Sequence, residues 1–149
     1  MERYKAKLVA QGFTQTYGID YEETFAPVAK LNSIRVLISL AVNLDRPLFQ
    51  FDIKNAFLNG DLDEDIYMKM SLSFGQGAGY NTVCKLKKSL YELKQSPRAW
   101  FKKFSITLNR LGYKQGQADH ILFIKLIGNE KKAILIVYVN DIIVTRDDL

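Results

Sequence analysis

Cysteine is almost absent from this sequence: Cys84 is the single cysteine among 149 residues. One thiol cannot form a disulfide within the chain, and it cannot supply the cysteine cluster of a structural zinc site. Disulfide-rich secreted folds and cysteine-based zinc folds are therefore excluded. A chain without disulfides fits a reducing compartment, so we expect the cytoplasm or the nucleus.

Long apolar runs are also missing. The N-terminal residues MERYKAKLVAQGF contain no apolar stretch of the kind found in signal peptides. The longest apolar run near the C-terminus, Ala133–Val139, is far shorter than the roughly 20 residues that cross a bilayer as a helix. We therefore expect an intracellular protein with no membrane partner. No linker, low-complexity tract or internal repeat divides the chain.

The composition is that of an ordinary globular protein, with 48% hydrophobic and 25% charged residues. A chain of this length can bury a core of its own. The formal net charge of +5 permits a polyanionic partner but does not require one.

Two amphipathic helices are predicted. The first begins near Asn32 or Ser33 as N-cap and ends before Pro47, with an apolar face formed by Ile34, Leu37, Ile38, Ala41 and Leu44. The second begins with Ser96 as N-cap and Pro97 in the first helical position, and it ends at Gly112. Its apolar stripe consists of Phe101, Phe104, Leu108 and Leu111.

Strand patterns surround these helices. Short strands are expected at Lys5–Val9 and Ile66–Met70, and Leu48–Asp52 alternates with Phe49 and Phe51 on one side. Further strands are expected at Ile121–Ile127, Ala133–Val139 and Ile142–Thr145, the last two joined by an Asn140–Asp141 turn. The order of elements predicts an α+β fold: one antiparallel sheet backed by helices on one face.

Two aspartates lie where apolar strands end. Asp52 closes LFQFD, and Asp141 lies in the turn between two apolar strands. If these strands are neighbours, about 5 Å apart, the two carboxylates meet at one edge of the sheet and can bind hard divalent cations. Two such cations could support phosphoryl transfer. The alternative is ordinary, because a turn aspartate often does no more than form its turn.

Longer blocks decide between these interpretations. Three sequence blocks occur in the order and at the spacing seen in copia-type reverse transcriptases: FDIKNAFLNGDLDEDIYMKM, VCKLKKSLYELKQSPRAWF and YVNDIIVT. The same holds for YKAKLVAQGFTQTYGIDYEETFAPVAKL and LGYKQGQADHILF, so the similarity covers nearly all of the chain. The sequence thus resembles part of a copia-type retrotransposon reverse transcriptase, the RNA-directed DNA polymerase of a Pol polyprotein.

The resemblance implies a right-hand polymerase fold with partial fingers, a first helix within about residues 1–47, and a palm at about 48–149. It implies two-metal nucleotidyl transfer of dNTPs onto an RNA or DNA template-primer. The cofactors would be two Mg²⁺ ions, or Mn²⁺ in their place. The catalytic positions would be Asp52, Asn140 and Asp141, and the metal ligands Asp52, Asp141 and the carbonyl of Ile53.

Nucleotide contacts are implied at further positions. Phe57, five residues after Asp52, falls where these polymerases place an aromatic ring that excludes a 2′-OH. Gln95 and Arg98 would lie near the nucleotide or template, and Lys5 and Lys7 near the triphosphate. From the residues alone, Phe57 would be a core aromatic and the lysines ordinary exposed side chains, whereas Arg98 could equally be a solvated helix residue.

The segment from Val83 to Lys114 is strongly basic. It holds nine basic residues and one acid, Glu92, a net charge of +8 over 32 residues. Such a segment beside an acidic metal site suits a nucleic-acid polymerase, although a solvated helix face gives the same pattern. The nucleic-acid-binding candidates are Lys85, Lys87, Lys88, Lys94, Lys102 and Lys103.

One departure from the family bears on catalysis. The family turn reads YVDD, whereas this chain has Asn140 before Asp141. Asparagine keeps a carbonyl oxygen but has no charge, so it cannot bridge two cations as a carboxylate can. Occupancy by Mg²⁺ is therefore doubtful, and we predict activity that is absent or lower by several orders of magnitude.

Smaller departures agree with this interpretation. Glu92 and Arg146 lie where the family usually has glycine, and the first predicts a strained backbone. The chain ends at Leu149, so we expect the thumb and RNase H parts of the polyprotein to be missing. Two alternatives stay open: a non-catalytic nucleic-acid-binding remnant, and a transposon relic with no selected function.

Overall fold

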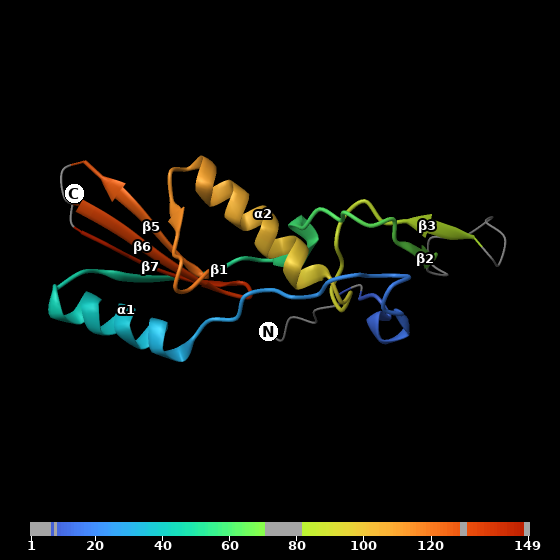
Figure 1. Ribbon diagram of the computed structural model, residues 1–149, viewed down its shortest axis with the longest axis horizontal. Helices are drawn as coiled ribbons and strands as arrows, with labels where there is room; N and C mark the ends of the chain where they lie inside the picture. Colours follow the sequence, from blue (N-terminus) through green and yellow to red (C-terminus); the bar gives the residue numbers. More distant parts are fainter. Residues whose placement is uncertain (1–6, 8, 71–81, 129–130, 148–149) are drawn as a thin grey trace, which may run out of the picture. The chain divides into compact units, whose positions relative to one another are not determined.

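The computed structural model describes residues 7, 9–70, 82–128 and 131–147 (Figure 1). The chain forms two compact units. Unit 1 comprises Met1–Phe25 and Phe57–Trp100, and unit 2 comprises Ala26–Ala56 and Phe101–Leu149. Among the helices that the structure describes, none is both long and apolar enough to span a membrane.

Unit 2 is built on a five-stranded antiparallel sheet with the order β1-β7-β6-β5-β4 (Figure 1). The strands are β1 (Leu48–Asp52), β4 (Lys114–Gln115), β5 (Leu122–Ile127), β6 (Lys131–Tyr138) and β7 (Asp141–Arg146). The helices are α1 (Leu31–Asn43) and most of α2 (Ser96–Arg110). The predicted mixture of helices and an antiparallel sheet is therefore confirmed.

Strand β6 is central and carries the core of unit 2. Residues Ala133–Val137 are all buried, which explains why this strand is a continuous apolar run rather than an alternating one. On one face of the sheet, Phe123 of β5 is fully buried against Phe101 and Phe104 of α2, at ring-centroid distances of 6.3 and 6.0 Å. This aromatic cluster joins α2 to the sheet.

Helix α1 begins earlier than the caps in the sequence predicted. Its N-cap is Lys30, which makes no side-chain cap, so the prediction of Asn32 or Ser33 as N-cap was wrong. The Ser33 hydroxyl instead donates to the buried carboxylate of Asp119, just before β5. A tertiary partner has replaced the local capping bond. The helix ends before Pro47 as expected, and Leu37 and Ala41 are its buried residues.

Unit 1 has a second sheet, which the sequence did not predict. Strand β2 (Tyr67–Lys69) pairs antiparallel with β3 (Val83–Lys85) and with no strand of the larger sheet. The expectation of a single sheet was therefore wrong. Strands β3 and β4, with three and two residues, were missed by the sequence analysis.

The core of unit 1 is small. Ala10, Ile66 and Leu93 are buried together, and three leucines pack against them: Leu62, Leu86 and Leu90. Short 3₁₀ helices lie at Gly12–Thr14 and Ala56–Asn59. The strand expected at Lys5–Val9 falls partly outside the described residues, and within them Val9 makes a single bridge with Tyr91.

Of the two predictions made for the ends of α2, the N-cap was wrong and the C-terminal stop is confirmed. Ser96 is its first helical residue rather than its N-cap, and its hydroxyl donates back to the Leu90 carbonyl. The C-terminal prediction is confirmed: Gly112 has a φ of 86°, and the Tyr113 N–H donates to the Leu108 carbonyl. A left-handed residue after the last turn is the usual helix stop, because glycine adopts it without strain.

Glu92 has a left-handed backbone with a φ of 69°, as its place in the sequence predicted. A side chain there costs roughly 1–2 kcal/mol. The surroundings add a constraint, since the Glu92 carbonyl lies against Gly12, where an added Cβ would come within 1.7 Å of it. The loop cannot easily relax away from this strain.

Replacing Glu92 by glycine is therefore expected to stabilise the chain. Relief of the left-handed strain outweighs the extra freedom that glycine gives the unfolded state, for a net gain of about 0.5–1 kcal/mol. Urea unfolding measures the change. The control is Glu22→Gly, also exposed but without a left-handed backbone, which should lower stability slightly. A loss of stability in Glu92→Gly would contradict the strain argument.

Candidate active site

Asp52 and Asp141 lie directly opposite each other in the sheet. The register of β1 and β7 pairs Leu48 with Thr145 at one end and Asp52 with Asp141 at the other. The condition for the two carboxylates to meet, that their strands are adjacent, is therefore fulfilled. Asp52 is exposed and Asp141 is half-buried, so both carboxylates can be reached from solvent.

The turn next to this pair differs by one residue from the prediction. Strand β6 ends at Tyr138 and β7 begins at Asp141, so the turn residues are Val139 and Asn140 rather than Asn140 and Asp141. Val139 takes a φ of 56°, which is unusual for a β-branched side chain. The apolar pattern hid the turn because valine normally belongs to a strand.

Asn140 is bound to the end of β1 twice. Its side-chain Nδ2 donates to Asp52 Oδ1 at 2.7 Å, and its backbone carbonyl accepts from the Ile53 N–H at 2.9 Å. On the other side, Gln50 Nε2 donates to Asp141 Oδ1 at 3.2 Å. Each carboxylate thus has an amide donor from the neighbouring strand or turn. Sequence reasoning missed Gln50, although the alternation of β1 puts it on the same side as Asp52.

These residues do not fit a two-cation centre well. A divalent cation needs oxygen ligands, whereas the amide N–H of Asn140 points at a carboxylate oxygen that would have to bind it. Within residues 7, 9–70, 82–128 and 131–147, no group of three or more His, Cys, Asp or Glu side chains is arranged to hold a metal ion. The donors that remain are two carboxylates and backbone carbonyls such as that of Ile53.

Phe57 lies in unit 1 beside Tyr91 and Lys7. The Phe57 and Tyr91 rings meet edge to face at 5.1 Å, and Lys7 Nζ lies 4.5 Å from the centre of the Tyr91 ring. Phe57 is half-buried, so part of its ring faces solvent. Tyr91 was not among the predicted site residues, and nothing in its local sequence singled it out. Lys5, the other lysine predicted near the triphosphate, lies outside the described residues.

Gln95 is fully enclosed, with 1% of its surface exposed. Its Nε2 donates to the Asp20 carbonyl at 3.1 Å, and its Oε1 accepts from Gln15 Nε2 at 3.1 Å. Both ends of its amide are therefore used within unit 1. In this structure Gln95 ties the N-terminal segment to the start of α2, and a direct nucleotide contact stays a prediction.

Arg98 is paired with acids of unit 1. Its guanidinium lies 3.2 Å from Glu23 and 3.7 Å from Glu64. The side chain is 32% exposed, so these pairs are partly screened by solvent. Arg98 therefore has carboxylate partners within unit 1, and its contact with a phosphate stays a prediction.

The six candidate lysines are all exposed, and an acidic partner is observed for Lys85 and for Lys88. Lys85 lies 2.5 Å from Asp65, and Lys88 forms an ion pair with Asp61. The hydrogen bond to Asp65 raises the pKa of the Lys85 ammonium, so this residue stays charged at any physiological pH. Lys87, Lys94, Lys102 and Lys103 are exposed as well, and nucleic-acid binding by all six stays a prediction.

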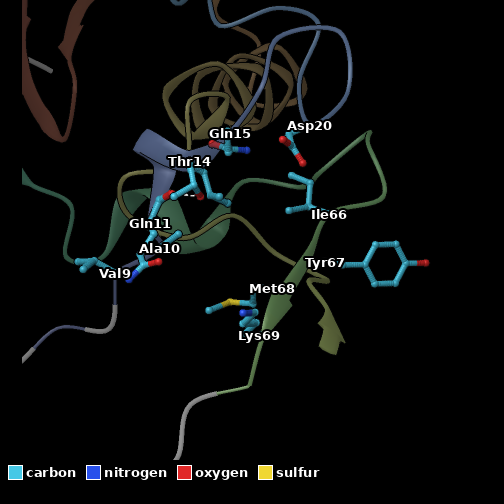
Figure 2. Close-up of a pocket in the computed structure, with 11 residues that line it drawn as sticks. Val9, Ala10, Gln11, Thr14, Gln15, Asp20, Ile66, Tyr67, Met68 and Lys69 are labelled. Atoms are coloured by element: carbon cyan, nitrogen blue, oxygen red, sulfur yellow. Dashed lines mark hydrogen bonds between the residues drawn. The ribbon is translucent and has the colours of Figure 1, made fainter. Parts of the chain in front are cut away.

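Unit 1 also contains a pocket of about 660 Å³ (Figure 2). It is lined by residues near Val9–Gln15, by β2 and by Asp20. Figure 2 shows Gln11, Thr14 and Gln15 along one wall and Met68 and Lys69 along another. Among the described residues predicted to contact the nucleotide, Phe57, Gln95, Arg98 and Lys7 do not line it, so the pocket gives them no support.

The chain belongs to the reverse transcriptase (RNA-dependent DNA polymerase) family, whose model matches residues 1–149. This confirms the resemblance on which the site was first predicted. No solved structure matches the chain.

Curated relatives are polyproteins of transposons. The chain is 44% identical over 146 residues to the retrovirus-related Pol polyprotein from transposon TNT 1-94 of Nicotiana tabacum, a match of 98% of this chain and 11% of the relative. It is 43% identical over 148 residues to that from transposon RE1 of Arabidopsis thaliana, covering 99% of this chain and 10% of the relative. The transposon Ty1-H Gag-Pol polyprotein of Saccharomyces cerevisiae is 27% identical over 151 residues, covering 98% and 8%. The chain thus spans about a tenth of the length of these relatives.

Proposed function

We propose that this chain is a palm-and-fingers segment of a copia-type reverse transcriptase, with the former catalytic site at Asp52, Asn140 and Asp141. The observation that carries the proposal is the direct opposition of Asp52 and Asp141 at the end of an antiparallel strand pair. Two carboxylates on adjacent strands, next to a tight turn, suit phosphoryl-transfer chemistry. Phe57, Gln95, Arg98, Lys5 and Lys7 would act at the dNTP. Residues 1–47 as fingers and 48–149 as palm stay part of this proposal.

The second part of the proposal is that nucleotidyl transfer is impaired. Enzymes of this kind use two Mg²⁺ or Mn²⁺ ions to stabilise the attacking and leaving oxygens. Asn140 brings no negative charge to the site, and its N–H occupies an oxygen of Asp52. Among the described residues, the side chains present do not form a site for these metal ions.

A chimeric enzyme tests this proposal. Residues 1–149 would replace the matching segment of the tobacco relative, so that the rest of its polymerase is supplied. Primer extension with Mg²⁺ is then compared with the unaltered relative. We expect extension near the background of a reaction without enzyme. A chimera as fast as its parent would refute the proposed impairment.

A second candidate function is nucleic-acid binding without catalysis. It is favoured by the exposed lysines of the Val83–Lys114 segment, since Lys87 and Lys94 protrude into solvent. Cations on a surface bind nucleic-acid backbones by releasing condensed counterions, so the affinity falls steeply with salt.

Replacing Lys87 and Lys94 together by alanine is expected to weaken binding of a primer-template duplex. Each lost phosphate contact should reduce the slope of log K against log salt by about 1. Fluorescence anisotropy at several salt concentrations measures both quantities. The control replaces Lys131 and Lys132, which are exposed at the start of β6. An unchanged slope in the first variant, or an equal change in both, would count against this function.

A further inference from the structure

The two carboxylates at the end of β1 and β7 pose an electrostatic problem. Asp52 and Asp141 are cross-strand partners, and like charges directly opposite each other destabilise an antiparallel pair. A divalent cation between them would remove the conflict. The structure offers a different solution, formed by side chains of this chain.

That solution is a pair of amide donors. Asn140 Nδ2 donates to Asp52 at 2.7 Å, and Gln50 Nε2 donates to Asp141 at 3.2 Å. Both donors are neutral, but each directs a partial positive charge at a carboxylate oxygen. Hydrogen bonds to ionised groups are the stronger ones, so the pair is well stabilised without an added cation.

Asn140 also holds the backbone. Its carbonyl accepts from the Ile53 N–H at 2.9 Å while its side chain binds Asp52. One residue therefore fastens the β6–β7 turn to two successive residues at the end of β1. The turn needs such a fastening, because Val139 is held in a left-handed backbone that a β-branched residue adopts at a cost.

We propose that Asn140, together with Gln50, takes the structural place of a divalent cation: the Asn140 amide satisfies Asp52 and the Gln50 amide satisfies Asp141, so the site is stable without metal and binds metal poorly. A cation could reach Asp52 Oδ1 only after the Asn140 hydrogen bond is broken. In return Asn140 would offer one neutral carbonyl ligand, which a hard cation prefers less than a carboxylate. This inference deepens the proposed function and rests on the identification of the former catalytic site.

The test is the dependence of stability on divalent cations. In Asn140→Asp the amide donor is lost and three carboxylates are brought together. Without a divalent cation we expect this variant to have a lower Tm than the unmodified chain. Addition of about 10 mM Mg²⁺ should raise its Tm by roughly 3–6 °C, for a Mg²⁺ dissociation constant of about 1 mM. The unmodified chain should show no such rise. All samples are compared at equal ionic strength, adjusted with NaCl, because salt alone screens like charges.

Two further variants separate charge from hydrogen bonding. Asn140→Ala removes the donor without adding a carboxylate, so it should lower Tm without making it depend on Mg²⁺. Asn109→Asp makes the same chemical change at an exposed position of α2 and should leave Tm independent of Mg²⁺. An equal Mg²⁺ response in the unmodified chain and in Asn140→Asp would overturn the proposal.

Direct binding provides a readout that does not require every variant to fold. Electron paramagnetic resonance of Mn²⁺ counts free and bound ions on the unmodified chain. No specific binding is expected up to about 1 mM Mn²⁺, and a site occupied well below that concentration would overturn the proposal. Neither measurement uses polymerase activity. If Asn140→Asp becomes metal-dependent but supports no primer extension, the inference stands and the proposed polymerase function fails.

Discussion

Primer extension at least about 10³-fold faster is expected when Asn140 of the chimeric enzyme is replaced by aspartate. The substitution removes the N–H that occupies Asp52 Oδ1 and adds a carboxylate where it can share a cation with Asp52. Loss of a single preorganised electrostatic group commonly costs 10²–10³-fold in rate, and a charged metal ligand contributes more than a neutral hydrogen bond. Single-turnover extension of a labelled primer measures the chemical step.

Two controls accompany the comparison of the chimera with its Asn140→Asp variant. Asn109→Asp in the same chimera adds the same charge on α2 and should leave extension at background. Asp52→Ala on top of Asn140→Asp should abolish the gain, because the restored carboxylate would have lost its partner across the sheet. Equal rates for the chimera and its Asn140→Asp variant would show that position 140 does not limit catalysis.

Truncation of Phe123 to alanine is expected to lower stability by about 3–5 kcal/mol. Phe123 is fully buried and meets both aromatic rings of the α2 face, Phe101 and Phe104. Its loss leaves a cavity that rings on a rigid helix and sheet cannot fill. Urea unfolding followed by circular dichroism measures the change, and Tm should fall by roughly 10 °C.

The matched control is Leu126→Ala on the same strand. Leu126 is 67% exposed, so its truncation should change stability by less than about 0.5 kcal/mol. A Phe123→Leu variant should lie between the two, because it keeps most of the buried apolar volume. If Phe123→Ala and Leu126→Ala were equally stable, the aromatic cluster would not hold α2 to the sheet.

Much of unit 2 could be predicted because its signals are local. The alternation of Leu48–Asp52 marked β1, the apolar run at Ala133–Val139 marked β6, and Gly112 marked the end of α2. Each of these signals depends only on the local periodicity of side chains or on the conformational freedom of a glycine backbone. The sequence placed Asp52 and Asp141 where apolar strands end, and the structure shows that β1 and β7 are adjacent.

Other features depended on partners far along the chain. Ser33 was expected to cap α1, yet it bonds Asp119, 86 residues away. Gln95 is bound by Gln15 and Asp20, and Tyr91 by Phe57 and Lys7. No periodicity marks such pairs, because they arise where loops of different segments meet. The turn position of Val139 was also not predictable from the local pattern, since a valine in a strand-like run gave no sign of a turn.

The amino-acid sequence by itself determined the family, the order of most elements and the missing charge at Asn140. Those properties follow from motif blocks, side-chain periodicity and the chemistry of a single residue. The tertiary structure decided what the amide at position 140 does. Only the pairing of β1 with β7 brings Asp52 beside Asn140, at 2.7 Å, and Gln50 beside Asp141. A hydrogen bond requires donor and acceptor within about 3 Å in a favourable direction, and that is fixed by strand register and turn geometry.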